Sequence, residues 1–412
     1  MHLNGMRRIF ALILISVVCL TVVSCEGFEN SQGNVEYEPI VLTKSQQAVA
    51  AKGDAFALDF LRVTSKQFPG ANVFLSPMSA SMLCCMLANG AEAETYAEIV
   101  KAIGMDGFTI DQVNDCYATL VNALLKADRS VSLSLANSIW ARPDLDVKDT
   151  FKKQMSDVYA ADSYLVDFLQ PSTLDRINGW CSDKTKGLIP KMFEELDPQV
   201  EMILINALYF KGTWQVQFTK GQTASAPFYA ASGQQTTADL MVAGASDAFT
   251  GYFDQTVSVA RLPYGNGAFY MEVIMPADKD FAAFLETLTP DKLARWDANT
   301  LQKFEVRFPK FKAEFDTEKQ LVPIMQALGM KKAFTYDAEF GKMSSSSLYV
   351  SNMRQKAFIS VDEEGTEAAA VTEADMRKNA SGPMRMVFDR PFVYLIREKS
   401  TGSILFIGTK QN

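Results

Sequence analysis

Apolar positions near the start of the chain recur with the period of an α-helix. Phe56, Phe60 and Val63 stand at i, i+4 and i+7, which places the three side chains on one helical face. This spacing predicts an amphipathic helix over about residues 45–66.

Two more helices are indicated by their end signals. Ser76 suits the N-cap of the apolar run that follows it, Pro77 suits the first helical position, and Gly90 suits the stop. A further helix is predicted over about residues 92–103, ending at Gly104.

The later sequence changes to patterns typical of strands. The predicted strands cover residues 133–140, 202–210, 257–275 with a turn at Gly265-Asn266-Gly267, and 306–311. Helices followed by many strands indicate an α+β fold.

Residues 361–374 have, from Thr366 onward, the alternation of a half-buried strand, but their intrinsic strand propensity is poor. One parity is small or uncharged, namely Thr366, Ala368, Ala370, Thr372, Ala374 and Met376, while the other carries Glu367, Glu373 and Asp375. Gly365 is expected to leave the backbone loosely specified. Such a segment would form a strand only where neighbouring strands supply the hydrogen bonds. Alternation alone does not distinguish it from a mobile surface linker.

Composition describes a globular, acidic chain. It has 412 residues, of which 48% are hydrophobic and 21% charged, with a net charge of -8. These values allow a large core and argue against disorder and against nucleic acid as a partner. No linker or repeat divides the chain, so one large domain is expected.

The N-terminus is predicted to be a targeting segment. Arg7 and Arg8 precede an apolar run over residues 9–23, which is short for a membrane span and leads to Cys25. This resembles a bacterial lipoprotein signal, with Cys25 lipidated; an ordinary secretory signal is the alternative. The predicted division is a signal at 1–24, the lipidated cysteine and a flexible acidic tether at 25–44, and the folded domain at 45–412.

The remaining cysteines match no common zinc spacing. They are Cys84, Cys85, Cys116 and Cys181. Buried thiols are the expectation, and a disulfide between Cys116 and Cys181 stays open as an alternative in an oxidising compartment.

Histidine is absent after the signal, because the chain's single histidine is His2. This argues against catalytic groups and metal sites that depend on histidine. No phosphate-binding or dinucleotide motif is present, so no cofactor or metal is expected. Catalysis by lysine or paired carboxylates stays open, but no spacing selects a pair among the 48 acids, and an enzyme is not expected.

Nine short motifs occur in the order typical of one family. They are NVFLSPMS at 72–79, the strand at 133–140, INGW at 177–180, TKG at 185–187, LINALYFKGTW at 204–214, LPY at 262–264, FPKF at 308–311, the Gly365 hinge and RPF at 390–392. Each is weak alone, but together they make the chain from about Ala48 to Thr409 resemble the serpins. The resemblance implies three β-sheets with a dominant large one, eight or nine helices and an exposed reactive loop.

The resemblance also implies a mechanism. A protease attacks the loop, forms an acyl-enzyme, and is trapped when the freed loop inserts as a strand into the large sheet. The hinge residues that this implies are Glu363, Gly365, Thr366, Glu367, Ala368, Ala369, Ala370 and Thr372. Bulky or charged side chains on the inserted parity would slow insertion.

The scissile bond is expected near residues 376–380. Counting from the hinge as in typical serpins places the residue that donates the carbonyl at Asn379, while a trypsin-like protease would choose Lys378 or Arg377. We favour Lys378. A protease that prefers Met or small residues could use Met376, Asn379 or Ala380.

Other positions match family residues that control opening of the sheet. Ser76, Pro77, Ser79 and Asn206 match the shutter beneath the sheet, and Trp214 matches an aromatic residue where the loop first inserts. Glu363 and Lys310 match an ion pair there. Gln355 stands where the family has a shutter histidine, which argues against a histidine-linked pH trigger. Each residue also has an ordinary interpretation as a cap, strand or core residue.

Three functions follow as hypotheses. The first is suicide inhibition of serine proteases, with cysteine proteases as a second target class, and the second is a non-inhibitory serpin that binds a ligand or has a structural role in the envelope. The third, an unrecognised hydrolase, lacks support without histidine. A monomer is expected. The signal predicts that its lipid holds it in the envelope of a Gram-negative bacterium, at the outer membrane, with surface exposure as one alternative.

Overall fold

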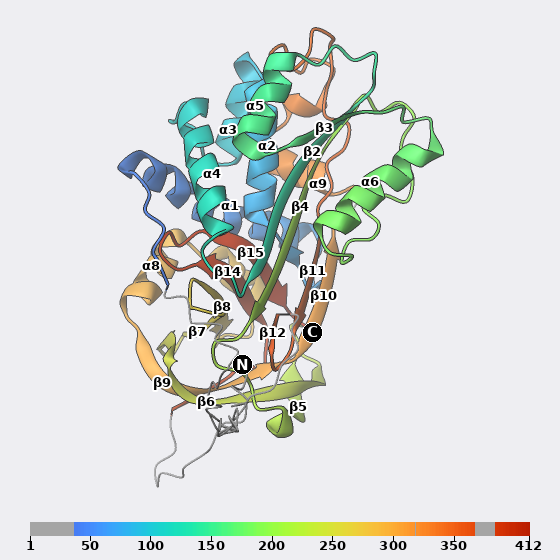
Figure 1. Cartoon of the computed structure of the whole chain (residues 1–412). Coiled ribbons are helices and arrows are strands. Elements are labelled where there is room, and N and C mark those ends of the chain that lie inside the picture. Colours follow the sequence, from blue (N-terminus) through green and yellow to red (C-terminus); the bar gives the residue numbers. More distant parts are fainter. Residues whose placement is uncertain (1–36, 318, 367–383) are drawn as a thin grey trace, which may run out of the picture. The chain divides into compact units, whose positions relative to one another are not determined.

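The computed structural model describes residues 37–317, 319–366 and 384–412, which form a mixed α+β fold (Figure 1). The helices in this part of the chain are α1 (Lys44–Gln67), α2 (Pro77–Gly90), α3 (Ala93–Ala102), α4 (Ile110–Leu124), α5 (Asp149–Tyr159), α6 (Pro171–Lys184), α7 (Phe281–Glu286), α8 (Pro290–Ala298) and α9 (Leu321–Ala327), with two 3-10 turns at Lys220–Gln222 and Lys332–Phe334. The expected α+β class and helix number are confirmed.

A six-stranded sheet runs through the molecule in the order β10-β11-β12-β4-β2-β3. Its strands are β10 (Phe311–Asp316), β11 (Lys356–Val361), β12 (Gly365–Thr366), β4 (Met202–Thr213), β2 (Ser132–Ala141) and β3 (Asp162–Leu165). All neighbours in it are antiparallel except β2 and β3, so β12 lies antiparallel to the strand on each side.

A nine-stranded sheet contains the other strands. In the order β1-β15-β14-β8-β7-β6-β9-β13, with β5 also on β6, they are β1 (Phe74–Leu75), β15 (Ile404–Lys410), β14 (Phe392–Glu398), β8 (Phe269–Pro276), β7 (Val257–Pro263), β6 (Gln235–Phe253), β9 (Leu301–Pro309), β13 (Arg385–Val387) and β5 (Ala224–Tyr229). The ladder between β6 and β9 shifts register between Ala243 and Thr250. The first part of β6 pairs with β5 and its last part pairs with β7, so β6 joins both groups of strands into one sheet. The resemblance implied three sheets, and the structure joins two of them through β6. The largest sheet is therefore not the one that holds the hinge.

The helical predictions are confirmed at their ends. α1 begins one residue before the predicted segment, behind a capping box between Thr43 and Gln46. Ser76 caps α2 by accepting a hydrogen bond from the Ser79 N–H, and Pro77 is its first residue. These signals succeed because the contacts that end a helix are made within a few residues along the chain.

The prediction of one strand over residues 306–311 is wrong, because this segment contains the end of one strand and the beginning of another. β9 ends at Pro309, β10 begins at Phe311, and the two belong to different sheets. The break at Lys310 directs its side chain to the hinge, as described below. The apolar positions change parity at the break, from Phe304, Val306 and Phe308 to Phe311, Ala313 and Phe315. A predicted strand that runs through residues 306–311 overlooks this change of parity.

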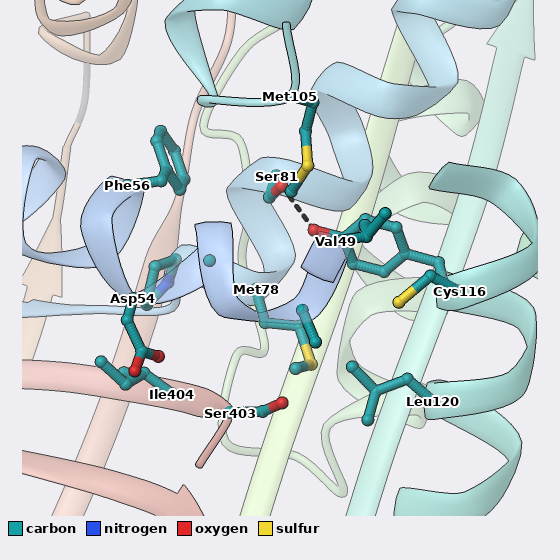
Figure 2. A pocket seen from close by; sticks show the side chains of 14 residues that line it. Val49, Asp54, Phe56, Met78, Ser81, Met105, Cys116, Leu120, Ser403 and Ile404 are labelled. Atoms are coloured by element: carbon teal, nitrogen blue, oxygen red, sulfur yellow. Dashed lines mark hydrogen bonds between the residues drawn. The ribbon is translucent and has the colours of Figure 1, made fainter. Parts of the chain in front are cut away.

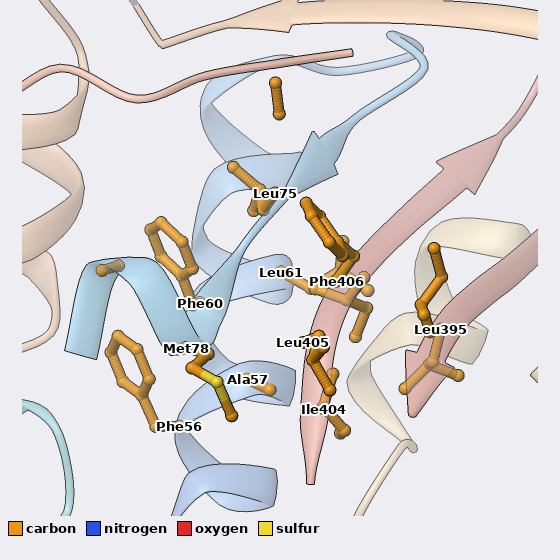
Figure 3. Close-up of a cluster of buried hydrophobic side chains, with 14 of the residues drawn as sticks. Phe56, Ala57, Phe60, Leu61, Leu75, Met78, Leu395, Ile404, Leu405 and Phe406 are labelled. Atoms are coloured by element: carbon orange, nitrogen blue, oxygen red, sulfur yellow. The ribbon is translucent and has the colours of Figure 1, made fainter. Parts of the chain in front are cut away.

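The main core lies between α1, α2 and the strands β1, β14 and β15. Figure 3 shows Phe56, Phe60 and Leu61 of α1 beside Leu75 of β1 and Phe406 of β15, and each of these side chains is buried. A second apolar cluster lies where α6 packs on β2 and β4, around Trp140, Ile177 and Trp180. α1 and α2 thus pack against strands of the nine-stranded sheet, whereas α6 packs against the six-stranded sheet.

Residues 37–43, which the sequence assigned to the tether, lie against the turn between β14 and β15. The Tyr37 hydroxyl donates to Glu398 Oε1 at 3.3 Å, and the Ile40 N–H donates to Ser400 Oγ at 2.8 Å. Leu42 is buried. The packed domain therefore includes this segment.

Candidate functional site

The hinge forms the short strand β12 in the middle of the six-stranded sheet (Figure 1). Gly365 pairs with Thr213 and Thr366 with Gly212 on β4, while Thr366 pairs with Val361 on β11. Two hinge residues thus already occupy one end of the position between β4 and β11.

Beyond Thr366 the same position holds no strand of the described chain, and β4 and β11 do not pair with each other there. A cavity of about 1030 Å³ lies at the first residues of β4. Met202 to Ile205 of β4 line it together with Ser351, Asn352 and Arg354 of the segment that leads into β11, and residues 192–198 and Val200 before β4 and residues of the α9 region between 319 and 326 complete the lining. We call this space the slot. Its β4 side is a row of backbone groups able to pair with an added strand.

The turn that leads into β12 is closed by Asp362. Its N–H donates to the Gly365 carbonyl at 3.0 Å, and its Oδ1 accepts from the N–H groups of Glu364 and Gly365 at 3.0 and 3.2 Å. The carboxylate therefore fixes the chain reversal between β11 and β12.

Trp214, which directly follows β4, makes two hydrogen bonds to the same turn. Its backbone N–H donates to the Glu364 carbonyl and its Nε1 to the Asp362 carbonyl, both at 2.9 Å. The Phe218 N–H donates to the Glu363 carbonyl at 2.9 Å. The structure thus places Trp214 at the hinge.

The Glu363 side chain lies in this turn with two partners. Oε2 accepts from Lys310 Nζ at 2.8 Å, and Oε1 accepts from Thr223 Oγ1 at 2.8 Å. Burial opposes the charged carboxylate, but these hydrogen bonds prevail and the pKa of Glu363 lies below its ordinary value. Lys310 and Glu363 therefore meet as the resemblance implied.

Glu364 makes an ion pair with Lys220 on the connection between β4 and β5. The Glu364 side chain is buried while Lys220 is largely exposed. Sequence reasoning missed Lys220 and Thr223, because nothing local distinguishes them from other polar residues of a connecting segment.

The shutter residues meet beneath the slot. Ser76 Oγ donates to the Leu405 carbonyl at 2.8 Å, and Ser79 Oγ is hydrogen bonded to Asn206 Oδ1. Asn206 Nδ2 then donates to Asn137 Oδ1 at 2.6 Å. Asn137 was missed by the sequence reasoning, although it lies directly opposite Asn206 in the ladder between β2 and β4.

Gln355, which stands where the resemblance implied a histidine, makes two hydrogen bonds to the backbone of Ser76. Its Oε1 accepts from the Ser76 N–H and its Nε2 donates to the Ser76 carbonyl, both at 2.9 Å. A neutral amide can satisfy both groups at once without titrating. The shutter therefore has polar contacts that do not depend on pH in the neutral range.

Several predicted residues lie outside the described part of the chain. These are Cys25, the hinge residues Glu367, Ala368, Ala369, Ala370 and Thr372, and the scissile-bond candidates Met376, Arg377, Lys378, Asn379 and Ala380.

A small cavity of about 30 Å³ lies among α1, α2, α4 and β15 (Figure 2). Cys116 and Ser81 line it, and the Ser81 hydroxyl is 2.5 Å from the Tyr117 hydroxyl. The described cysteines are all buried and free, including Cys116 and Cys181, and burial raises the pKa of Cys116 to about 11. Such thiols are poor nucleophiles.

Neither a metal-ligating cluster nor a helix fit to cross a membrane occurs in the described ranges.

The fold thus combines a nine-stranded sheet with a six-stranded sheet in which a two-residue strand lies between β4 and β11. The chain matches the family description "Serpin (serine protease inhibitor)" over residues 51–412. It belongs to the serpin family.

Its relatives include protease inhibitors from animals. It is 32% identical over 350 residues to iripin-3 of Ixodes ricinus, covering 82% of this chain and 88% of iripin-3. It is 30% identical over 378 residues to the leukocyte elastase inhibitor of Bos taurus, covering 88% of this chain and 98% of the inhibitor.

Solved structures share the fold over most of the chain. The thermophilic serpin tengpin in its native state aligns with a TM-score of 0.79 at 29% identity, covering 92% of this chain and 97% of tengpin. Thyroxine-binding globulin in complex with thyroxine aligns equally well, with a TM-score of 0.79 at 24% identity, covering 89% of this chain and 99% of the globulin. The fold alone therefore does not define the function.

Proposed function

We propose that the protein inhibits proteases as a suicide substrate rather than turning over a substrate as an enzyme. The observation that carries the proposal is β12. Its two residues pair with β4 and β11 at one end of the space between these strands, and the slot lies farther along β4. In the proposed reaction the protease nucleophile attacks a loop carbonyl, the amine side of the peptide bond leaves, and the acyl-enzyme travels with the inserting strand.

The register at the hinge supports the length of the inserted strand. Continuing the pairing of Thr366 with Gly212 along β4 would place Thr372 opposite Asn206 and Met376 opposite Met202, the first residue of β4. At about 3.4 Å per residue this strand would be roughly 35 Å long. The matching register on β11 would bring Thr372 opposite Gln355, which precedes that strand.

This register leaves residues 377–380 beyond the start of β4, where a protease could hold them. We therefore propose cleavage in the segment Met376 to Ala380, with Lys378 as the preferred residue on the carbonyl side and a trypsin-like serine protease as the target. Cysteine proteases are the second proposed class, because they also form an acyl-enzyme.

The test mixes the full chain with trypsin-like, elastase-like and papain-like proteases. A trapped enzyme is expected as a covalent band that survives boiling in detergent, and the mass of the released C-terminal peptide identifies the cleaved bond. Cleavage by every protease without a covalent band would overturn the inhibitor proposal. A bond outside residues 376–380 would overturn the proposed specificity alone.

A matched pair of variants tests insertion itself. Thr366→Arg would put a cation on the buried side of β12, whereas Glu367→Arg would put the same side chain on the opposite parity. We expect Thr366→Arg to be cleaved without trapping and Glu367→Arg to keep trapping, because only the first buries an unpaired charge. Equal trapping by both would contradict insertion in this register.

The alternative is a non-inhibitory serpin that binds a ligand or has a structural role. Thyroxine-binding globulin, whose structure was solved with bound thyroxine, has the same fold, so the fold is compatible with this alternative. The small side chains on the inserted parity favour inhibition, since they meet the requirement for rapid insertion. Loop cleavage without a trapped complex and without a gain in thermal stability would favour the alternative.

We further propose that Cys25 carries a lipid and that a tether ending before Tyr37 holds a monomeric domain on the envelope of a Gram-negative bacterium, at the outer membrane. The short apolar run before Cys25 supports this. The mass of the N-terminal peptide from purified protein tests lipidation, with Cys25→Ser as the control. Protection from added protease on intact cells would exclude surface display.

A further inference from the structure

Thr366 ends the described hinge with its side chain against Tyr264. Thr366 Oγ1 lies 2.7 Å from Tyr264 Oη, and the two residues are 2% and 0% exposed. Two hydroxyl groups this deeply buried need partners inside the protein, and this hydrogen bond gives each of them one.

The Tyr264 ring is held from two sides. It stacks on Trp214 at a centroid distance of 4.4 Å and an angle of 13°, and it meets the edge of Phe210 at 5.1 Å. Its backbone N–H donates to the Phe269 carbonyl at 2.8 Å. The ring therefore cannot swing away from the hinge without displacing Trp214, which itself binds the hinge turn.

Gly212 provides the room that the ring needs to reach the hinge. A Cβ at Gly212 would lie 2.9 Å from Tyr264 Cδ1. Gly212 is also the β4 partner of Thr366. One position of β4 thus both pairs with the hinge backbone and admits the tyrosine that binds the hinge side chain.

The hydrogen bond between Thr366 and Tyr264 determines which of the two alternating sets of side chains in the inserted strand faces Tyr264. Successive side chains of a strand point to opposite faces, so a slip by one residue would present Glu367 to Tyr264 in place of Thr366. A carboxylate is unfavourable in a site that offers one hydroxyl and aromatic rings. A threonine at this point therefore sets the parity of every residue that follows.

We propose that Tyr264 is a positioning residue for loop insertion, whose hydroxyl receives the Thr366 side chain and fixes the register of the strand before cleavage. This inference rests on the proposed inhibitory function. Tyr264 does not touch the protease; it acts through Thr366.

The test compares Tyr264→Phe, Thr366→Val, the double variant and Thr366→Ser in a titration against a trypsin-like protease. Each single variant that loses a hydroxyl is expected to need about three- to tenfold more inhibitor per trapped enzyme, as loss of one buried hydrogen bond implies. The double variant should be no worse than the poorer single one, and Thr366→Ser, which keeps a hydroxyl, should stay near the wild type. Additive losses in the double variant would overturn the proposal.

Tyr394→Phe is the matched control. Tyr394 is fully buried in the same core, and its hydroxyl has no hydrogen-bond partner among the described residues. Removing this hydroxyl should leave the titration unchanged. An equal loss in Tyr394→Phe and Tyr264→Phe would assign the effect to general core packing and overturn the proposal.

Amide hydrogen exchange of residues 361–366 provides a readout that needs no protease. Tyr264→Phe and Thr366→Val should raise exchange at Gly365 and Thr366 about three- to tenfold, with Tyr394→Phe unchanged. Unchanged exchange in both variants would overturn the positioning role even if the wild type traps proteases. Faster exchange in a protein whose wild type traps none would retain the hinge contact and reject the inhibitory function.

Discussion

Gly365 on β12 lies against the backbone of Gly212 on β4. A Cβ at Gly365 would lie 2.7 Å from the Thr213 Cα and closer still to the Gly212 carbonyl oxygen. The sequence predicted a loosely specified backbone at Gly365, but the structure shows a close-packed one. The glycine is required by space, because φ at Gly365 is not positive.

Gly365→Ala is therefore expected to displace the hinge from β4. The overlap is with backbone, which cannot rotate away, and should destabilise the engaged hinge by about 1–3 kcal/mol. Amide exchange of residues 361–366 would rise, and more inhibitor would be cleaved per trapped protease. Gly244→Ala in β6 is the control, since a Cβ there meets nothing within 4 Å. Equal behaviour of the two variants would contradict the steric argument.

Glu363→Gln is expected to destabilise the protein by about 1–3 kcal/mol at pH 7, because Lys310 and Thr223 lose their carboxylate partner. The pKa of Glu363 is lowered in the folded state, so its contribution is present above the ordinary value of 4.5 and is lost as the pH falls below it. Urea unfolding at pH 7 and pH 3.5 should show the difference from wild type shrinking at the lower pH.

The control for Glu363→Gln is Asp247→Asn. Asp247 pairs with Lys303 at 3.6 Å, but both side chains are largely exposed. Such pairs contribute about 0–1 kcal/mol. A change at Glu363 no larger than at Asp247 would count against a structural role for the hinge ion pair.

Gln355→His is expected to introduce a pH dependence that the wild type lacks at this position. The imidazole would occupy a buried site beside Ser76, where burial disfavours the charged ring and lowers its folded pKa. Stability would then be lost as the pH falls through the unfolded histidine pKa of about 6.5. Denaturation midpoints between pH 5 and 8 measure this, and a variant curve parallel to that of the wild type would refute it.

Asp54 is expected to make the stability of the folded protein depend on pH with a sign opposite to that of Glu363. Burial raises its pKa to about 6 from an ordinary 3.8, although Arg397 lies 3.5 Å away and lowers it, while Glu272 and Asp297 add to the rise. The folded state therefore binds the proton more tightly, and stability should fall by about 2–3 kcal/mol between pH 4 and pH 7.

Asp54→Asn should remove most of that slope, as measured by urea unfolding across the same range. Asp59→Asn, at an exposed acid on the same helix, is the control and should leave the slope unchanged. An unchanged slope in Asp54→Asn would show that other groups cause the pH dependence.

Local signals were enough for the elements whose contacts are local. The caps of α1 and α2 and the face formed by Phe56 and Phe60 follow from neighbours a few residues apart. The residues that contact the hinge could not be predicted from such local signals. Tyr264 is 102 residues from Thr366 and Lys220 is 144 residues from Glu364, so no pattern within one segment could connect them.

The sequence by itself predicted a segment able to become a strand, because small and charged side chains alternate from Thr366 to Met376 and this alternation can be recognised without a partner. Only the tertiary structure decided where that strand begins. β12 exists because β4 and β11 stand apart on either side of it, and Gly212 and Gly365 allow the backbones to approach. Strand pairing joins distant segments, so its geometry is fixed only once the sheet is assembled.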